Sequence, residues 1–304
     1  MAGAAVQPQL PADVVRHICR FLPQRAWLLF GGAYRLTRWP TLRRLQYVEL
    51  GAVELPPALP SMPPSLRALV LHDNGACALA QLKPHAGVRL LSLGALPLYL
   101  HHCPTVTNSG CPALCGFPQL RCLHLSAMQL DDEDGRQLTA AVTRGACRHL
   151  HTLHLDRNFL RRTPAALVAA VCARRQLQHL ELGYNPLGQA CVAALLRELA
   201  AAPPQPQLCY LGLGCLGWAE DPALTALFCD FLPQWAPALH ELVVECNNLA
   251  LASVRCIAQL CLDDRLPALQ HLDLSDNLAT RAQTATLTRA LRPRLSALCL
   301  HCGL

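Results

Sequence analysis

Leu269-Gln-His-Leu272-Asp-Leu274-Ser-Asp-Asn277-Leu278 decides the fold, because its pattern L-x-x-L-x-L-x-x-N recurs along the chain. Further copies run over 150–158, 177–185 and 239–247. Successive side chains of a strand point to opposite faces, so Leu272 and Leu274 face inward and the residues between them face solvent. Asn277 lies where the chain turns, and its side chain can bond backbone groups of the adjacent turn. One unit cannot bury its leucines alone, so the copies must stack.

Looser copies extend the pattern over most of the chain. Units begin at Leu45, Leu66, Val88, Leu120, Leu150, Leu177, Leu208, Leu239, Leu269 and Leu295, which makes ten repeats. The first two intervals, of 21 and 22 residues, leave no room for a full helix. The later intervals have that room, and cap signals such as Asp221-Pro222 and Thr280 start their helices. We expect helices over 135–142, 165–172, 188–202, 252–262 and 282–291, and one that follows Pro222 and includes Phe228.

This repeat resembles the leucine-rich repeat, and the long units look like those of the ribonuclease-inhibitor class. The resemblance implies an α/β solenoid over residues 45–304. In that horseshoe a parallel sheet lines the concave face, and the helices lie outside.

Residues 1–44 differ from the repeats and form a short N-terminal helical segment. The spacing of L-P-x-x-V-V-x-x-I-x-x-F-L-P resembles the start of an F-box. That resemblance implies docking to the linker subunit of a cullin-based ubiquitin ligase. The contact would be made by Leu10, Pro11, Val14, Val15, Ile18, Phe21 and Leu22.

Other interpretations of the chain stay open. The N-terminal helices can instead cap the solenoid, in which case the protein serves as a scaffold in a cytoskeletal or other large assembly. The repeat type and the abundant cysteine also suit an inhibitor that resembles ribonuclease inhibitor. The last unit stops after its strand, and either a partner covers this edge or the chain tolerates a short exposed one.

The composition narrows the class of protein. Hydrophobic residues make up 52% of the 304 and charged residues 15%, which is too apolar for disorder. No apolar run reaches the roughly 18 residues of a membrane span, and a net charge of +6 gives no special support to nucleic-acid binding. Seventeen cysteines without a secretory signal predict reduced thiols and a cytoplasmic or nuclear setting.

The outward strand positions predict a protein-binding surface. Alignment places His124, His154 and Glu181 at one outward position of consecutive repeats, with Asp156 and His179 nearby. Neighbouring strands lie about 4.8 Å apart, so these side chains are expected to touch. They then form a protein-contact patch; a metal or proton-coupled site and an inert surface are the alternatives. The outward charges change sign along the array, from Arg67, Arg89 and Arg121 in early repeats to Glu181, Glu241, Glu245, Asp273 and Asp276 in late ones, where His271 also faces outward. Such a gradient suits a polar protein partner on the concave face.

The sequence carries no phosphate-binding loop, nucleophile elbow or H-E-x-x-H helix, so we expect a non-enzymatic protein without a cofactor. Two groups have the residue types of a metal site. His101, His102, Cys103, Cys111 and Cys115 lie in one unit, where they could hold zinc or, with Cys111 and Cys115 on one helix face, form ordinary core. Cys299, His301 and Cys302 straddle a strand, which favours a structural role.

Overall fold

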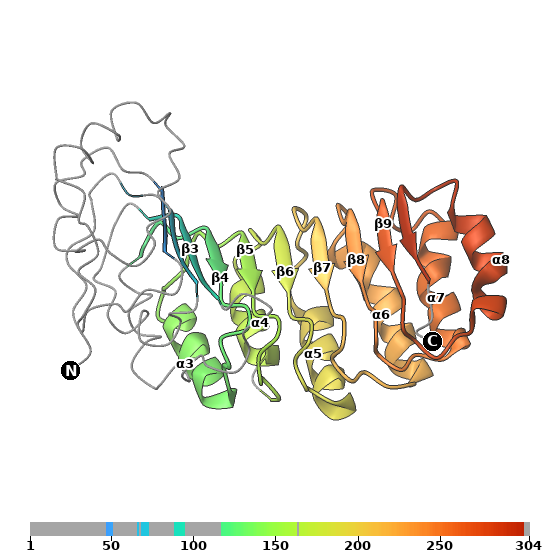
Figure 1. Cartoon of the computed structure of the whole chain (residues 1–304), viewed down its shortest axis with the longest axis horizontal. Helices are drawn as coiled ribbons and strands as arrows, with labels where there is room; N and C mark the ends of the chain where they lie inside the picture. Colours follow the sequence, from blue (N-terminus) through green and yellow to red (C-terminus); the bar gives the residue numbers. More distant parts are fainter. Residues whose placement is uncertain are drawn as a thin grey trace, which may run out of the picture.

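The computed structural model describes residues 47–50, 66, 68–72, 88–94, 117–162 and 164–300. Within them, ten strands form one parallel sheet in strict sequence order (Figure 1). The strands are β1 (Tyr47–Leu50), β2 (Ala68–His72), β3 (Leu90–Gly94), β4 (Cys122–His124), β5 (Thr152–His154), β6 (His179–Glu181), β7 (Tyr210–Gly212), β8 (Glu241–Val243), β9 (His271–Asp273) and β10 (Ala297–Cys299). One strand for each predicted unit confirms the ten-repeat solenoid.

Six helices follow strands β4 to β9 and form the second layer (Figure 1). They are α3 (Asp132–Thr143), α4 (Pro164–Cys172), α5 (Gln189–Ala201), α6 (Pro222–Trp235), α7 (Leu251–Leu262) and α8 (Arg281–Leu291). Each helix packs against the next one in the chain. Helices need 8–10 Å between axes whereas strands need about 4.8 Å, so the helical layer is the longer one and the sheet takes the concave side.

The inward positions of the repeat form one continuous core between the two layers. Leu272 and Leu274 of the opening stretch are buried, as are the equivalent leucines of the earlier repeats from Leu120 onward. The helices contribute residues such as Leu195, Phe228 and Ile257, which are also fully enclosed. The predicted inward face is therefore confirmed over the described repeats.

The asparagine that ends the motif joins each repeat to the one before it. Asn158 Oδ1 accepts from the backbone N–H groups of Met128, at 2.9 Å, and Leu130, at 3.0 Å. Its Nδ2 donates to the carbonyl oxygens of Leu125 and Leu155. Asn185, Asn247 and Asn277 make equivalent bonds. The buried amide thus satisfies turn groups that neither repeat could pair alone.

Helix ends are also capped by side chains of neighbouring repeats. Glu220 accepts from the backbone N–H of Ala250 at 2.6 Å and from the Ser253 hydroxyl at 3.0 Å, at the start of α7. Ala250, the N-cap residue, has no capping side chain of its own. At the other ends, Arg174 donates to the carbonyls of Val142, in the last turn of α3, and Ala146, just after it, and Arg294 donates to those of Cys261 and Leu262, the last two residues of α7. Acid at a helix start and arginine at a helix end both complement the helix dipole.

The residue before the asparagine position adopts a left-handed backbone in six successive repeats. These residues are Ala127, Arg157, Tyr184, Cys215, Cys246 and Asp276, with φ between 52° and 59°. None is glycine, so each turn holds a residue with a side chain in a backbone conformation that such residues rarely adopt. The column places five residue types at the same end of the sheet, with Cys at two positions, and Ala127 is its buried member.

The predicted helices agree with the structure apart from their ends. α3 begins at Asp132 rather than Gly135, because Asp131 acts as N-cap and bonds the backbone N–H groups of Glu133 and Asp134. α5 spans 189–201 where 188–202 was expected. The N-terminal segment 1–44, including all seven residues of the predicted linker-subunit contact, lies outside the described residues. No helix of the described part has the length and apolarity needed to cross a membrane.

Candidate functional site

Four stacked rings cross the solvent-facing side of strands β4 to β7. His124 and His154 have ring centroids 4.3 Å apart, His154 and His179 are 4.6 Å apart, and His179 and Tyr210 are 3.9 Å apart. The last two pairs are nearly parallel, at 10° and 4°. We call these four residues the ring ladder. Its members come from four consecutive repeats, so the solenoid repeat itself places them.

The ring ladder does not follow a single line of register partners across the sheet. Between β5 and β6 it shifts by two residues, from the His154 position to the His179 position. The strand register pairs His154 with Glu181, and it pairs His179 with Thr152 on one side and Tyr210 on the other. Thr152, the register partner of His179 on β5, carries no ring, and His179 instead stacks diagonally with His154. His124, His154 and Glu181 do share one register column, as the alignment indicates, but His154 stacks on His179 and Glu181 turns the other way.

Glu181 is held over the next strand by three neighbours. Its carboxylate accepts hydrogen bonds from the Tyr210 hydroxyl and from the backbone N–H of Gly183, the latter at 2.7 Å. It occupies the space above Gly212, where any Cβ atom would overlap the carboxylate. Burial raises the pKa of Glu181, although the two hydrogen bonds lower it. Burial and the Glu181 contact raise the pKa of Tyr210 well above its usual range, so the phenol stays a donor.

A second acid, Glu245, repeats this arrangement nearer the ends of the strands. The Tyr184 hydroxyl donates to Glu245 Oε1 at 2.8 Å, from two repeats away. A Cβ atom on Gly214 would lie 2.7 Å from Glu245 Cγ. The hydrogen bond to Glu245, and then burial, raise the pKa of Tyr184 well above its usual range. Each acid thus lies over a glycine of the Leu208 repeat, and each is bonded by a tyrosine.

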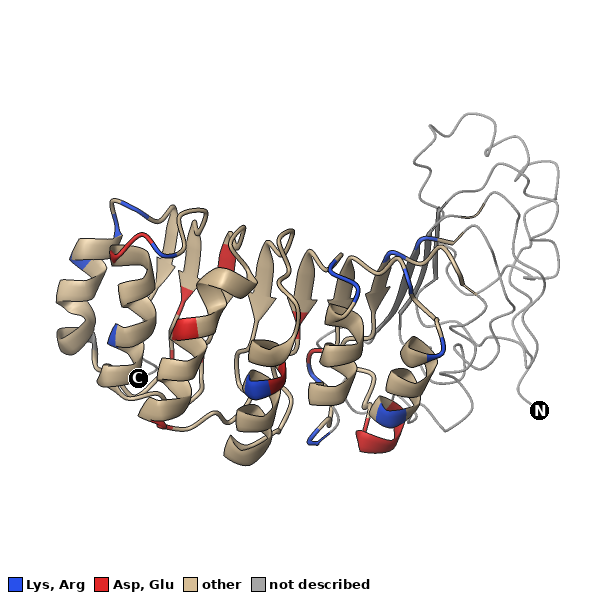
Figure 2. Cartoon of the chain, turned by 180° about the vertical axis from the view of Figure 1, so that it is seen from behind, with Lys and Arg blue, Asp and Glu red and all other residues tan. Residues whose placement is uncertain are grey.

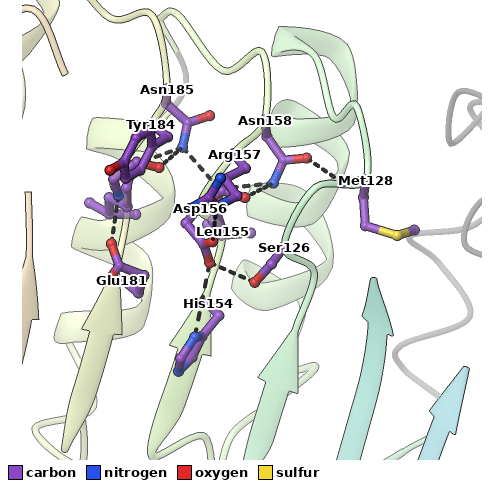
Figure 3. A network of polar contacts seen from close by, with 12 residues as sticks. Ser126, Met128, His154, Leu155, Asp156, Arg157, Asn158, Glu181, Tyr184 and Asn185 are labelled. Atoms are coloured by element: carbon purple, nitrogen blue, oxygen red, sulfur yellow. Dashed lines mark hydrogen bonds and ion pairs between the residues drawn. The ribbon is translucent and has the colours of Figure 1, made fainter. Parts of the chain in front are cut away.

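Asp156 links the ring ladder to the left-handed column (Figure 3). Its carboxylate accepts from the Ser126 hydroxyl at 2.5 Å and lies 3.8 Å from Arg157 Nε and 4.0 Å from His154 Nδ1. The Arg157 guanidinium in turn lies 4.6 Å from the centroid of the Tyr184 ring. Polar contacts therefore run without a break from Ser126 to Glu245 across the middle of the sheet.

The histidines of the ring ladder are held in their neutral form. Burial, and then the proximity of His124 and His179, lower the pKa of His154 to about 3. Burial is also the main cause that lowers the pKa of His124 and of His179. Two adjacent imidazolium rings would repel, so stacking at this separation favours rings without charge. At neutral pH the ring ladder is a rigid polar surface that carries no net charge of its own.

The charges on either side of the ring ladder follow the predicted gradient. Arg89 and Arg121 are exposed beside β3 and β4. Beyond β7, Glu241 lies 3.6 Å from His271, and Asp273 accepts from the Ser275 hydroxyl at 2.6 Å. Figure 2 shows acidic positions along the later strands and basic ones near the N-terminal end of the described sheet. The concave side therefore presents opposite charge at its two ends.

The structure places most of the predicted concave residues on one continuous surface. Arg67 and the zinc candidates between His101 and Cys115 lie outside the described residues, as do His301 and Cys302. In the described ranges, no group of three or more His, Cys, Asp or Glu side chains could hold a metal ion. Sequence reasoning missed Tyr184, Tyr210, Ser126 and Arg157, which hold the acids in place. The signal for Tyr210 was its register position next to His179.

Solved structures with a similar fold were found. A Listeria monocytogenes internalin (inlF) aligns with a TM-score of 0.51 and 16% identity, over 89% of this chain and 72% of its own. A structure described as an octameric complex of Latrophilin 3, Unc5D and FLRT2 (LRR) aligns with a TM-score of 0.51 and 16% identity, over 91% and 75%. No family model matches the chain, and no curated protein sequence does. The similarity supports the leucine-rich-repeat fold and nothing finer.

Proposed function

We propose that this chain is a non-enzymatic recognition module that binds a protein partner on its concave face. We define the recognition face as the solvent-facing side of β3 to β9 and of the turns that follow these strands, with the ring ladder crossing β4 to β7. The observation that carries the proposal is the fixed arrangement of these side chains. Rings stacked at 3.9–4.6 Å and acids bonded to tyrosines lose little conformational freedom when a partner binds.

The chemistry of the face indicates what the partner must offer. Tyrosine is enriched in protein interfaces, and Tyr184 remains 42% exposed although its hydroxyl is bonded. Phe159, which follows the same turn as Arg157, is 55% exposed. The acids beyond β7 favour basic groups on one part of the partner, and Arg89 and Arg121 favour acidic groups on another part.

The test is to purify partners with the full chain and then measure binding of an identified partner to variants. On the recognition face, Tyr184→Ala and Glu241→Ala are expected to weaken binding by about tenfold or more each. Arg197→Ala and Glu198→Ala, at exposed positions of α5 on the helical layer, are the matched controls and should leave binding unchanged. The proposal fails if the helical-layer variants lose binding while those on the sheet retain it.

We further propose that the F-box-like segment docks the linker subunit of a cullin-based ubiquitin ligase, with the concave face presenting the substrate. The support is the spacing of apolar residues from Leu10 to Leu22. Ile18→Asp in the full chain should abolish capture of the purified linker subunit, while circular dichroism shows the repeats still folded. If the unaltered chain does not bind the linker subunit either, the ligase role is wrong and the recognition module remains.

A further inference from the structure

The junction between two neighbouring repeats holds two pairs of thiols, one pair on each layer. On the helical layer, Cys229 of α6 and Cys256 of α7 have their Sγ atoms 3.3 Å apart. On the sheet side, Cys215 and Cys246 occupy the left-handed column in the same two repeats, and burial and then the Cys246 thiol raise the pKa of Cys215. All four are free cysteines. Each layer of this junction thus contains one pair of neighbouring cysteines, one from each repeat.

The first pair has its sulfurs in contact, and the second pair lies on neighbouring backbone segments. A disulfide needs sulfurs about 2.05 Å apart and Cα atoms about 4.4–6.8 Å apart. The sulfurs of Cys229 and Cys256 are already in contact, so a small side-chain rotation suffices. For the second pair, the backbone N–H of Cys215 donates at 2.9 Å to the carbonyl of Glu245, the residue before Cys246. The two backbones therefore run side by side, and both residues have the same left-handed φ of 52°.

We propose that this junction is a dithiol oxidation site, at which a hydroperoxide converts Cys229–Cys256 and Cys215–Cys246 into cross-repeat disulfides. The more accessible thiol of each pair reacts first. Cys256 is partly exposed whereas Cys229 is buried, and Cys246 is more exposed than Cys215. Burial and the partner thiol raise the pKa of Cys229 and of Cys215, which keeps those two sulfurs protonated and resolving rather than attacking.

The chemistry balances in two steps. The Cys256 thiolate attacks one peroxide oxygen; an S–O bond forms, the O–O bond breaks, and the other oxygen leaves and takes a proton. The Cys229 sulfur then attacks the Cys256 sulfur; the S–S bond forms, the S–O bond breaks, and water leaves with the proton from Cys229. Two thiols lose two electrons and two protons, and one hydrogen peroxide becomes two waters. The same balance applies to Cys246 and Cys215.

Oxidation at this position adds covalent bonds between repeats that are otherwise joined by packing and hydrogen bonds. In a solenoid each repeat contacts only its neighbours, so each junction is a place where the array can open. The Cys229–Cys256 bond ties α6 to α7, and the Cys215–Cys246 bond ties the turns that follow β7 and β8. Both would fix the two repeats that carry Tyr210, Gly212, Glu241 and Glu245.

The test treats the full chain with excess hydrogen peroxide, blocks free thiols with an alkylating agent and maps peptides without reduction. Cleavage after basic and acidic residues places Cys229, Cys246 and Cys256 in three different peptides. We expect a peptide linking Cys229 to Cys256 and one linking Cys215 to Cys246, both released by dithiothreitol. We also expect the midpoint of thermal unfolding to rise on the order of 5 °C on oxidation.

Single substitutions separate this result from unspecific oxidation. Cys229→Ser should remove the first linked peptide and leave Cys256 as a sulfinic acid, while Cys215–Cys246 still forms. Cys191→Ser, at a partly buried thiol of α5, is the control and should change neither link. If a linked peptide is absent from the unaltered protein while its exposed thiol is over-oxidised, the proposal is overturned for that pair. If the Cys256→Ser variant still forms a linked peptide, now between Cys229 and Cys261, the assignment of the pair on the helical layer is overturned.

Discussion

The carboxylate of Glu181 lies where a side chain on Gly212 would have to be. The two residues are register partners on β6 and β7, and the carboxylate fills the gap above the glycine to reach Tyr210. Two residues of β7 therefore hold the Glu181 carboxylate. Tyr210 donates a hydrogen bond to it, and Gly212, which has no Cβ atom, leaves the space that it fills. This relationship fixes the middle of the recognition face.

Gly212→Ala should displace Glu181 and break its bond to Tyr210. We expect the free energy of unfolding to fall by about 2 kcal/mol, because the added methyl group overlaps the carboxylate. Urea denaturation measures the loss. In a Glu181→Ala background the overlap is gone, so the same glycine substitution should cost much less. Equal costs in the two backgrounds would contradict the relationship, since coupled neighbours are not additive.

Asn158→Ala should be among the most damaging single changes in the sheet-side turns. The substitution leaves the backbone groups of Met128, Leu130 and Leu125 without their partner, so we expect a loss of about 3 kcal/mol. Gln270→Ala, at an exposed position of a later repeat, is the comparison and should change stability by less than about 0.5 kcal/mol. Similar losses for the two variants would show that the buried amide contributes nothing special.

Acid should destabilise the protein through the ring ladder. His154 has a folded pKa of about 3 and an ordinary value of 6.5. The unfolded chain therefore takes up a proton that the folded chain refuses. The stabilising contribution is fully present above pH 6.5 and is lost as the pH falls from 6.5 toward 3, by at most about 1.4 kcal/mol per pH unit for this group. The lowered pKa values of His124 and His179 act in the same direction.

Urea denaturation at pH 7.5 and pH 5 measures this dependence. His154→Gln removes one titrating group and should flatten the slope. His240→Gln, at an exposed position outside the ring ladder, should leave the slope as it is. A His154 variant with the slope of the unaltered protein would mean that other groups cause the acid sensitivity.

Arg174→Ala should loosen the end of a helix in the preceding repeat. The guanidinium bonds the carbonyls of Val142 and Ala146, which have helix-end positions, and its loss should cost about 1–2 kcal/mol. Hydrogen exchange should show faster opening at the C-terminal end of α3, although the substitution lies after α4. Arg197→Ala, on the exposed side of α5, should leave α3 unaffected. Faster exchange confined to α4 would refute the cross-repeat cap.

The sequence predicts the scaffold well, because the repeat specifies it. The spacing of Leu269, Leu272 and Leu274 predicts inward burial, and Asn277 predicts a bonded turn; both are confirmed. Alignment also places His124, His154 and Glu181 in one register column. These outcomes depend only on which residue occupies which repeat position, and that information is explicit in a single sequence.

The contacts between outward side chains could not be predicted in the same way. The diagonal contact of His154 with His179 joins residues that are not register partners, and the reach of Glu181 depends on Gly212. Such choices are made by side-chain rotamers and by the space that neighbours leave. Outward residues of neighbouring repeats have to be compared together to find such contacts. The lack of a side chain at Gly212 indicates that Glu181 can extend over β7 and reach Tyr210.

The capping of helix ends by adjacent repeats limits how the gene could be cut and rejoined. α7 takes its N-terminal cap from Glu220, in the repeat before it, and its C-terminal cap from Arg294, at the end of the repeat after it. A segment excised at motif boundaries would carry helices without their caps. Transplanting or deleting these repeats thus requires that the capping residues be transferred as well. A chimera that keeps only the leucine pattern would have the repeat fold but lack the hydrogen bonds that cap its helices.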